Sequence, residues 1–207
     1  MQLRYETGLT GEQYVIARAW REARLERCPN HPRGGCSFAR HGTYERKTPP
    51  GARVARWYCP QSHTTFSLLP DCLAARLPGT LNALEAVVAA AEQATSLAAA
   101  ANAVRRDTVE LPGAMRWVRR RVRLVHNALN AVIGLIPDRL APCVPNIAAV
   151  RGRLASENAL TKLRTLAAPQ LRRLPAPLGF HPHRLGVTDR NLLIQHKAGP
   201  DPPPAAV

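Results

Sequence analysis

The stretch CPNHPRGGCSFARHGTYERKTPPGARVARWYCPQSHTTF, residues 28–66, gathers cysteine and histidine at both ends of a short basic segment. Residues 38–47 and 53–59 are predicted to be two strands, because the sequence TPPG at 48–51 between them is typical of a turn. A hairpin that separates two ligand pairs is suited to a structural zinc site, since each pair supplies half of a tetrahedron. The candidate ligands of this zinc ribbon are Cys28, His31, Cys36, Cys59 and His63.

Spacing alone leaves the choice of four ligands open. Cys28 and Cys59 fit best, together with either His31 or Cys36. The candidates for the fourth position are His31, Cys36 and His63, and His41 is a weaker one. The simpler alternative is that these are ordinary cysteines and surface histidines. A catalytic zinc fits less well, because it would need an open position beside a general base, and the His-x-Glu and Pro-Cys-x-x-Cys pairing of zinc deaminases is absent.

The chain is strongly basic. Among its 207 residues, Lys and Arg number 29 and Asp and Glu 14, which gives a formal net charge of +15 and a pI of about 11.0. A charge of this size favours a polyanionic partner such as DNA, RNA or an anionic membrane surface. Only Lys47, Lys162 and Lys197 are lysines, so part of the charge reflects the arginine codon bias of a GC-rich genome.

Apolar patterning and cysteine usage indicate a cytoplasmic protein. No run of about 18 uninterrupted apolar residues occurs, which argues against a transmembrane helix. The N-terminus, MQLRYETGLTGEQ, lacks the apolar centre of a signal peptide. Cys72 and Cys143 stand alone among apolar residues, away from the cysteine cluster. Metal ligands plus buried thiols in a reducing compartment explain this distribution better than a disulfide framework does.

Helices are predicted for most of the chain outside the hairpin. Thr10 and Gln13 form a capping-box pattern at the start of the first helix, and Pro112 suits the first position of the longest. The predicted helices cover residues 10–27, 81–94, 95–105, 112–136, 146–154 and 157–174. The residues from 176 onward are rich in Pro, Gly and His and are expected to be a disordered tail.

The longest predicted helix is amphipathic and basic. Its apolar seam alternates spacings of three and four residues: Met115, Val118, Val122, Val125, Leu129, Val132 and Ile136. Arginines occupy its other faces, and no acidic residue occurs between Glu110 and Asp138. Alanines at 98–101 and 103 would let the preceding helix approach closely, leaving the arginines free to meet phosphates or guanine edges. The alternative is a solvated face on a helical bundle.

The hairpin resembles the N-terminal zinc ribbon of bacterial insertion-sequence transposases and related transposon proteins. The matching residues are the CPxHP knuckle, RHGTYER at 40–46, RWYC at 56–59 and TFS at 65–67, and this chain carries histidine where the usual ribbon has second cysteines. Residues 96–126, with RWVRR in the basic helix, are similar to transposase helix-turn-helix segments. The resemblance implies binding to a transposon end or an operator, a bacterial, nucleoid-associated location, and a homodimer or a separate transposase subunit as partner.

An enzymatic role is not expected. A transposase needs a carboxylate triad that holds two metal ions, yet the acids after residue 111 are only Asp138, Glu157, Asp189 and Asp201. None of them ends a readable strand, and neither a phosphate-cradling GxxxxGK[ST] loop nor a GxSxG elbow occurs. The chain would therefore be a DNA-recognition portion without a catalytic domain of its own.

The sequence thus predicts a mainly α protein with a small β-hairpin zinc ribbon and a helix-turn-helix-containing helical domain. The expected division is 1–68 for the N-terminal helix and zinc ribbon, 69–137 for the helix-turn-helix domain, 138–175 for C-terminal helices and 176–207 for the tail. It would bind double-stranded DNA, hold a structural Zn²⁺ and avoid membranes. The expected DNA contacts are Arg40, Arg46, Lys47, Arg53, Arg56, Arg116, Arg119, Arg120 and Arg123.

Two other functions compete with DNA binding. The first is a protein-interaction module, in which zinc is purely structural and the long apolar seam pairs with a partner helix or with itself. The second is RNA binding, which gains little support because aromatic residues make up only 5% of the chain and single-strand recognition relies on stacking. Core packing is the expected role of the clustered aromatics Trp57, Tyr58 and Phe66.

Overall fold

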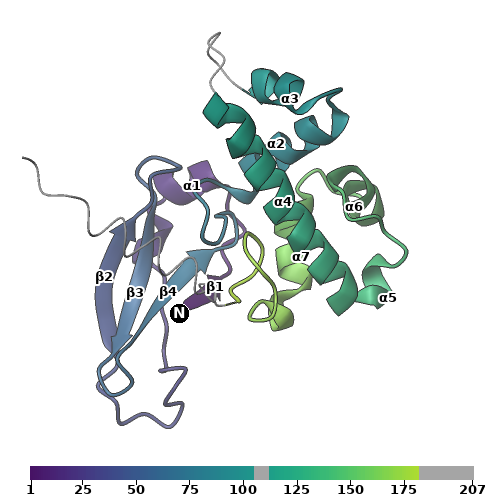
Figure 1. Ribbon diagram of the computed structural model, residues 1–207. Coiled ribbons are helices and arrows are strands. Elements are labelled where there is room, and N and C mark those ends of the chain that lie inside the picture. The colour runs from purple at the N-terminus through teal and green to yellow at the C-terminus, as the bar shows by residue number, and fades with distance from the viewer. Residues whose placement is uncertain (105–111, 182–207) are drawn as a thin grey trace, which may run out of the picture.

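A four-stranded sheet packs beside a layer of helices in the computed structural model, which describes residues 1–104 and 112–181 (Figure 1). The strands are β1 (Gln2–Tyr5), β2 (Ala39–Glu45), β3 (Arg53–Cys59) and β4 (Thr64–Pro70), and their order in the sheet is β1-β4-β3-β2. β1 runs parallel to β4, whereas the other neighbours are antiparallel. The predicted hairpin is confirmed as β2 and β3, and the sheet around it makes the fold mixed α/β rather than mainly α.

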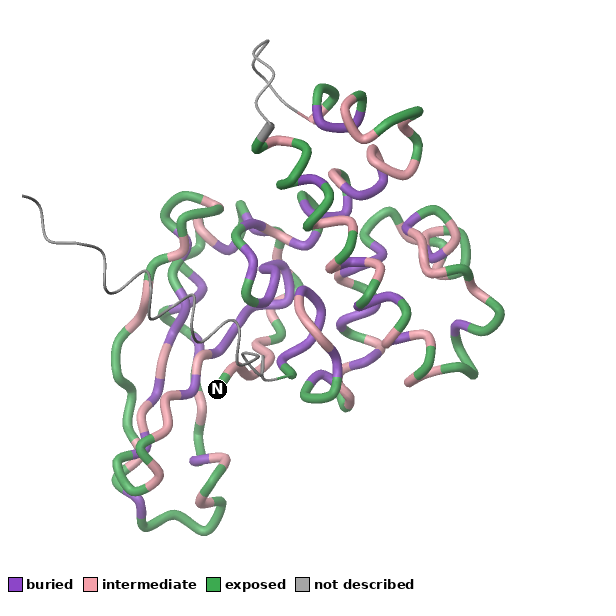
Figure 2. Tube along the Cα trace, in the orientation of Figure 1, coloured by how far each residue is buried: buried purple, intermediate pink, exposed green. Residues whose placement is uncertain are grey.

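The two faces of the sheet have different environments. On the inner face, alternate residues of β3 and β4 are buried against the chain between α1 (Gly11–Ile16) and β2, and this small core consists of Ala23, Cys28, Cys36, Ala55, Trp57, Cys59, Phe66 and Leu68. On the outer face, Val54 joins the main core, whereas Arg56 and Tyr58 are only half-buried. Figure 2 shows that buried residues gather where the sheet meets the helices and that exposed ones dominate the opposite end of the hairpin.

The main core lies between the helices and one end of the sheet. The helices are α2 (Leu81–Gln93), α3 (Leu97–Val104), α4 (Pro112–Leu135), α5 (Pro137–Leu140), α6 (Ile147–Leu154) and α7 (Ala159–Leu166). α2 is central, since it contacts α3, α4, α6 and α7. None of the helices in the described part of the chain combines the length and the apolar character that crossing a bilayer requires.

Two carboxylates of α2, seven residues apart, hold the starts of two later helices. Glu85 is 1% exposed and accepts hydrogen bonds from the backbone N–H groups of Ala159 and Leu160, at 3.1 and 2.8 Å, in the first turn of α7. Glu92 accepts from the backbone N–H of Ile147, the first residue of α6. A negative charge at a helix N-terminus satisfies free N–H groups and opposes the helix dipole favourably.

The first predicted helix, residues 10–27, ends earlier than expected. α1 stops at Ile16, Arg18 adopts a left-handed φ of 48°, and the chain continues as a 3₁₀ turn at Ala19–Arg21. The guanidinium of Arg40 donates to two main-chain oxygens of that turn, at 2.7 and 3.0 Å. The carbonyl oxygens of Trp20 and Arg21 therefore accept hydrogen bonds from a distant side chain. In a longer helix they would accept from backbone N–H groups four residues further on.

The packed part of the chain extends past the predicted start of the tail at 176. The buried guanidinium of Arg164 donates to the main-chain oxygens of Pro177 and Leu178, at 2.6 and 2.9 Å, and also to those of the loop that follows β4. Leu178 and Phe180 are buried in the main core. Residues 182–207, and the turn at 105–111 that the helix-turn-helix prediction requires, lie outside the described residues. One continuous core spans the predicted boundary at 68/69.

Candidate metal centre

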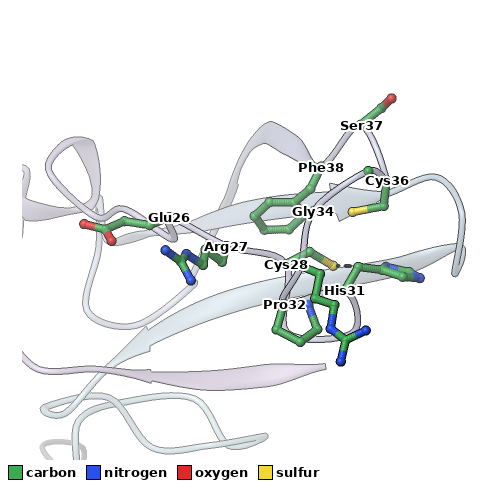
Figure 3. A pocket seen from close by; sticks show the side chains of 11 residues that line it. Glu26, Arg27, Cys28, His31, Pro32, Gly34, Cys36, Ser37 and Phe38 are labelled. Atoms are coloured by element: carbon green, nitrogen blue, oxygen red, sulfur yellow. Dashed lines mark hydrogen bonds between the residues drawn. The ribbon is translucent and has the colours of Figure 1, made fainter.

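Four side chains converge at the end of the hairpin away from the helices. Cys28 and His31 belong to a tight turn in which the His31 N–H donates to the Cys28 carbonyl at 3.1 Å. Cys36 follows on a loop, and Cys59 is the last residue of β3. Their ligand atoms all lie within 4.8 Å of one another. Figure 3 shows Cys28, His31 and Cys36 around the cavity that opens beside them.

The spacing of these ligand atoms fits a tetrahedral ion. Nδ1 of His31 lies 3.5 Å from Sγ of Cys28 and 3.4 Å from Sγ of Cys59. A tetrahedral zinc, with bonds of about 2.3 Å to sulfur and 2.0 Å to nitrogen, holds such ligands roughly 3.5 Å apart. The three cysteines are buried and the histidine is half-buried, so the set could hold a metal ion such as zinc with little exposure of the thiolates.

The thiols differ in how readily they ionise. Burial acts to raise the pKa of Cys59, but hydrogen bonds from Ser62 and from the neighbouring thiols outweigh it and lower that pKa to about 6. Burial, together with hydrogen bonds to Cys28 and Cys59, raises the pKa of Cys36 to about 11. Close thiols cannot all be ionised together without a cation. A bound metal removes this conflict, because it deprotonates the thiols that coordinate it.

Packing on the inner face fixes the ligand-bearing segments. The ring of Phe38 meets Phe66 edge-on, with centroids 5.9 Å apart, and Arg40 lies over the ring of Trp57. Between the turn and Cys36, Gly34 and Gly35 have φ values of 86° and 81°, which residues with a side chain rarely adopt. This backbone turns Cys36 back toward the other ligands. The adjacent cavity, about 600 Å³, is lined partly by these glycines and by Arg27 and Arg33.

The fifth predicted ligand, His63, is not among the four clustered residues. Its Nδ1 lies 3.1 Å from the hydroxyl of Tyr58, on the outer face of the sheet. His41, the outside candidate, also lies beside Tyr58, with ring centroids 5.6 Å apart. Spacing could not separate these candidates, because Cys59-x-x-x-His63 would suit a knuckle if the backbone after Cys59 turned inward. The cluster is therefore Cys28, His31, Cys36 and Cys59.

The basic residues of the sheet differ in how they are used. Arg40 and Arg46 donate to main-chain oxygens of segments that pack against the sheet. Lys47 and Arg53 are exposed. Arg56 is half-buried, with its guanidinium carbon 5.8 Å from the centre of a tyrosine ring.

The predicted arginines of α4 are all exposed: Arg116, Arg119, Arg120 and Arg123. On the opposite side of the helix, Val118, Val125, Leu129 and Val132 are buried, so most of the predicted apolar seam is confirmed. Arg121 stacks on the ring of Trp117 at 3.5 Å. Its pKa is lowered to about 10 by burial and by the neighbouring charge of Arg120.

Two features of the structure have no counterpart in the sequence-based predictions. The first lies in the helical layer, away from the metal centre: Glu85 and Glu92 of α2 hold the starts of α7 and α6, which only the three-dimensional contacts reveal. The second is the group formed by Tyr58, His41 and His63 on the outer face, for which the alternation of β3 was an available signal, since Tyr58 must point away from Trp57 and Cys59. No family model matches the chain, and no curated protein or solved structure gave a significant match.

Proposed function

We propose that this protein binds double-stranded DNA through the exposed arginines of α4, and that a structural Zn²⁺ holds the end of its β2–β3 hairpin. The observation that carries the proposal is the arrangement of Arg116, Arg119, Arg120 and Arg123. Their spacing of three, four and seven residues places them on one side of the helix, and all four are exposed. The stripe they form is about 10 Å long at 1.5 Å per residue, enough to follow phosphates along one groove edge.

The packing of α4 leaves this stripe free. α3 approaches it on the apolar side, where Ala100 and Ala101 contact the buried Val118. Small side chains allow the two helices to pack closely, as in a helix-turn-helix, and keep the arginines away from the contact. The sequence around the stripe contains no acid, so the local potential is positive. These features support a DNA-recognition role, with a transposon end or an operator as the target and the catalytic step left to a separate subunit.

The zinc supports the fold at a different end of the molecule. Figure 1 shows that the metal-bearing end of the hairpin and the first turns of α4 lie far apart. The small core around the cysteines contains few large apolar side chains, of which Trp57 and Phe66 are two. A coordinated ion supplies the folding free energy that so small a core lacks. Zinc fits best among the metals, because three thiolates and one imidazole in a tetrahedron are its preferred ligands.

A salt titration tests the DNA proposal. Replacing all four stripe arginines by glutamine is expected to weaken binding to a labelled duplex and to lower the slope of log K against log salt by up to about 3.6, since each phosphate contact contributes about 0.9. The matched control replaces four exposed arginines elsewhere: Arg24, Arg139, Arg172 and Arg173. The control removes the same charge and should leave most of the slope. Equal effects of the two variants would show that net charge, not α4, binds the duplex.

A protein-interaction role is the second candidate, favoured by two exposed apolar side chains on α4. Met115 is 40% and Trp117 42% exposed. In this alternative, α4 pairs with a partner helix or with a second copy of the chain. Light scattering that shows a dimer, together with no retardation of duplex DNA at low salt, would favour it over DNA binding.

A further inference from the structure

The one exposed aromatic side chain in the described part of the chain lies on α4. Trp117 is 42% exposed, whereas every other Trp, Tyr and Phe of that part is buried or half-buried. At about 100° of rotation per residue, Trp117 lies about 60° round the helix from Arg120, at the border of the arginine stripe. The buried Val118 and Val125 lie beyond it, on the face that packs against other helices. The ring therefore adjoins the surface that we propose for duplex DNA.

A cation fixes the orientation of this ring. The guanidinium carbon of Arg121, one turn further along α4, lies 3.5 Å from the centre of the indole. The same guanidinium donates to the main-chain oxygen of Trp117 at 3.4 Å. A planar guanidinium can stack on an aromatic face in this way, which an ammonium cannot. One face of the indole is thus covered by the protein itself, and the exposed remainder is held in place before a partner arrives.

The cations around Trp117 call for a polyanion. Within the described part of the chain, ion pairs involve only cations elsewhere in the fold, and none is formed by the five arginines within two turns of α4: Arg116, Arg119, Arg120, Arg121 and Arg123. Like charges so close together repel one another, and a row of phosphates relieves the repulsion.

A partner helix fits this surface less well than a nucleic acid strand does. The other exposed large apolar residue of α4, Met115, lies about 160° from Trp117 round the helix, on the far side of the stripe. The two side chains therefore do not form one apolar patch. What borders Trp117 on its exposed side is arginine, so its partner must offer an apolar group directly beside anionic ones.

We infer that Trp117, held by Arg121, packs on a deoxyribose of the strand whose phosphates bind the stripe. This role rests on the proposed duplex binding and adds a positioning residue to it. Sugars alternate with phosphates along a strand, so a ring that borders a row of phosphate-binding arginines meets a sugar. Phosphate contacts alone let a protein slide along DNA. A bulky ring seated between two phosphates sets the register of α4 on the strand.

An apolar contact has a different salt dependence from a phosphate contact, because it releases no counter-ions. The test uses the full chain loaded with zinc and the anisotropy of a labelled duplex, measured over a range of salt. Trp117→Ala removes roughly 60–100 Å² of exposed surface, the 42% that is free in the protein. It is expected to weaken binding by about 10- to 50-fold at every salt concentration and to leave the slope of log K against log salt unchanged.

Three further variants separate the ring from its surroundings. Trp117→Phe keeps an aromatic ring and should lose less than about 5-fold in affinity. Arg121→Lys keeps the charge but cannot stack, so it should weaken binding without changing the slope. The matched control, Met115→Ala, removes an equally exposed apolar side chain of α4 and should bind like the unmodified chain. Metal content and circular dichroism check that each variant is folded.

Fluorescence tests the contact in the unmodified chain. Trp20 and Trp57 are only 8% and 6% exposed, so Trp117 supplies most of the emission that acrylamide can quench. Saturating duplex should lower the quenching constant to about that of Trp117→Phe, in which this emission is absent.

The outcomes distinguish the role of Trp117 from the proposed function itself. If the stripe variant binds duplex weakly but Trp117→Ala binds normally and quenching persists on DNA, the role of Trp117 is overturned and duplex binding stands. A lower salt slope for Trp117→Ala would also overturn it, since the ring would then act through the charges. If the unmodified chain binds no duplex at low salt, both are wrong. If quenching falls as protein concentration rises without DNA, a second copy covers the ring, which overturns the sugar contact.

Discussion

Removal of the metal ion that we propose for the cysteine–histidine cluster should open one end of the molecule and leave the rest folded. The small core around Cys28, Cys36 and Cys59 is separate from the main core, which the helices build with Val54 and Leu69 of the sheet. We therefore expect a chelator to release the segment that leads into β2, at residues 23–38. The helices should keep their structure, since none of the clustered ligands belongs to them.

The expected change in opening is set by the free energy of metal binding, and the backbone hydrogen bonds of the turn remain when the metal is gone. At a free metal concentration of about 100 times the dissociation constant, binding stabilises the closed segment by about 2.7 kcal/mol. Without metal, the turn keeps two backbone hydrogen bonds, His31 N–H to Cys28 and Gly34 N–H to His31, at 3.1 and 2.9 Å. Each contributes roughly 0.5–1.5 kcal/mol. Opening should thus become about 100-fold more frequent on chelation.

Hydrogen exchange with and without chelator measures this directly. Peptides that cover residues 23–38 should lose about two orders of magnitude of protection, while peptides from α2 and α4 should be unchanged. Cys59→Ser should reproduce the loss without chelator, and Cys143→Ser, which alters a thiol outside the cluster, should not. The reasoning is refuted if the purified chain contains no metal and is equally protected, or if the loss spreads evenly through the helices.

Three further results are expected from single substitutions. Elemental analysis should find that Cys59→Ser lowers the metal content below one ion per chain, whereas His63→Ala leaves it at one, since His63 contacts Tyr58 rather than the ligands. Glu85→Ala should lower the free energy of unfolding in urea by about 2–6 kcal/mol, because it leaves the buried N–H groups of Ala159 and Leu160 without an acceptor, at about 1–3 kcal/mol each. Glu157→Ala, which removes an 88% exposed partner of the arginine that Glu85 also binds, should cost about 1 kcal/mol or less. Thr80→Ala, which removes the N-cap of α2, should lower thermal stability by about 1 kcal/mol.

Local signals in the sequence predicted local structure well. The capping box of Thr10 and Gln13 is present as predicted, and α2 begins at Leu81, the predicted start of its helix, with Thr80 as its N-cap. α4 begins at Pro112 and ends at Leu135, one residue before the predicted end. Each of these features depends on residues within one helical turn of each other, so the sequence contains the whole interaction.

The missed elements depend on contacts between distant residues. β1 is a strand because Gln2–Tyr5 pairs in parallel with residues 67–70. A local sequence pattern cannot predict a pairing between segments more than 60 residues apart. β4 is likewise defined by its partners, since it pairs with both β1 and β3, and no strand is predicted at residues 64–70 from their local pattern. The choice of His31 over His63 likewise depends on how the backbone turns after Cys59. All four clustered residues are among the five candidates that the sequence offers. That His63 lies outside the cluster follows only from the fold.

The net charge of +15 says less about DNA than the partners of individual arginines do. Arg40, Arg46 and Arg164 each donate to main-chain oxygens and so stabilise the fold. A guanidinium held in this way has fewer donors left for a phosphate, and moving it would expose carbonyls that it satisfies. Of the α4 arginines, Arg121 donates to the main-chain oxygen of Trp117, whereas the four stripe arginines make no such bond within the described part of the chain. A basic surface for nucleic acid should therefore be identified by cations that the fold does not use, and this criterion favours the four exposed arginines of α4, on which the proposed duplex binding rests.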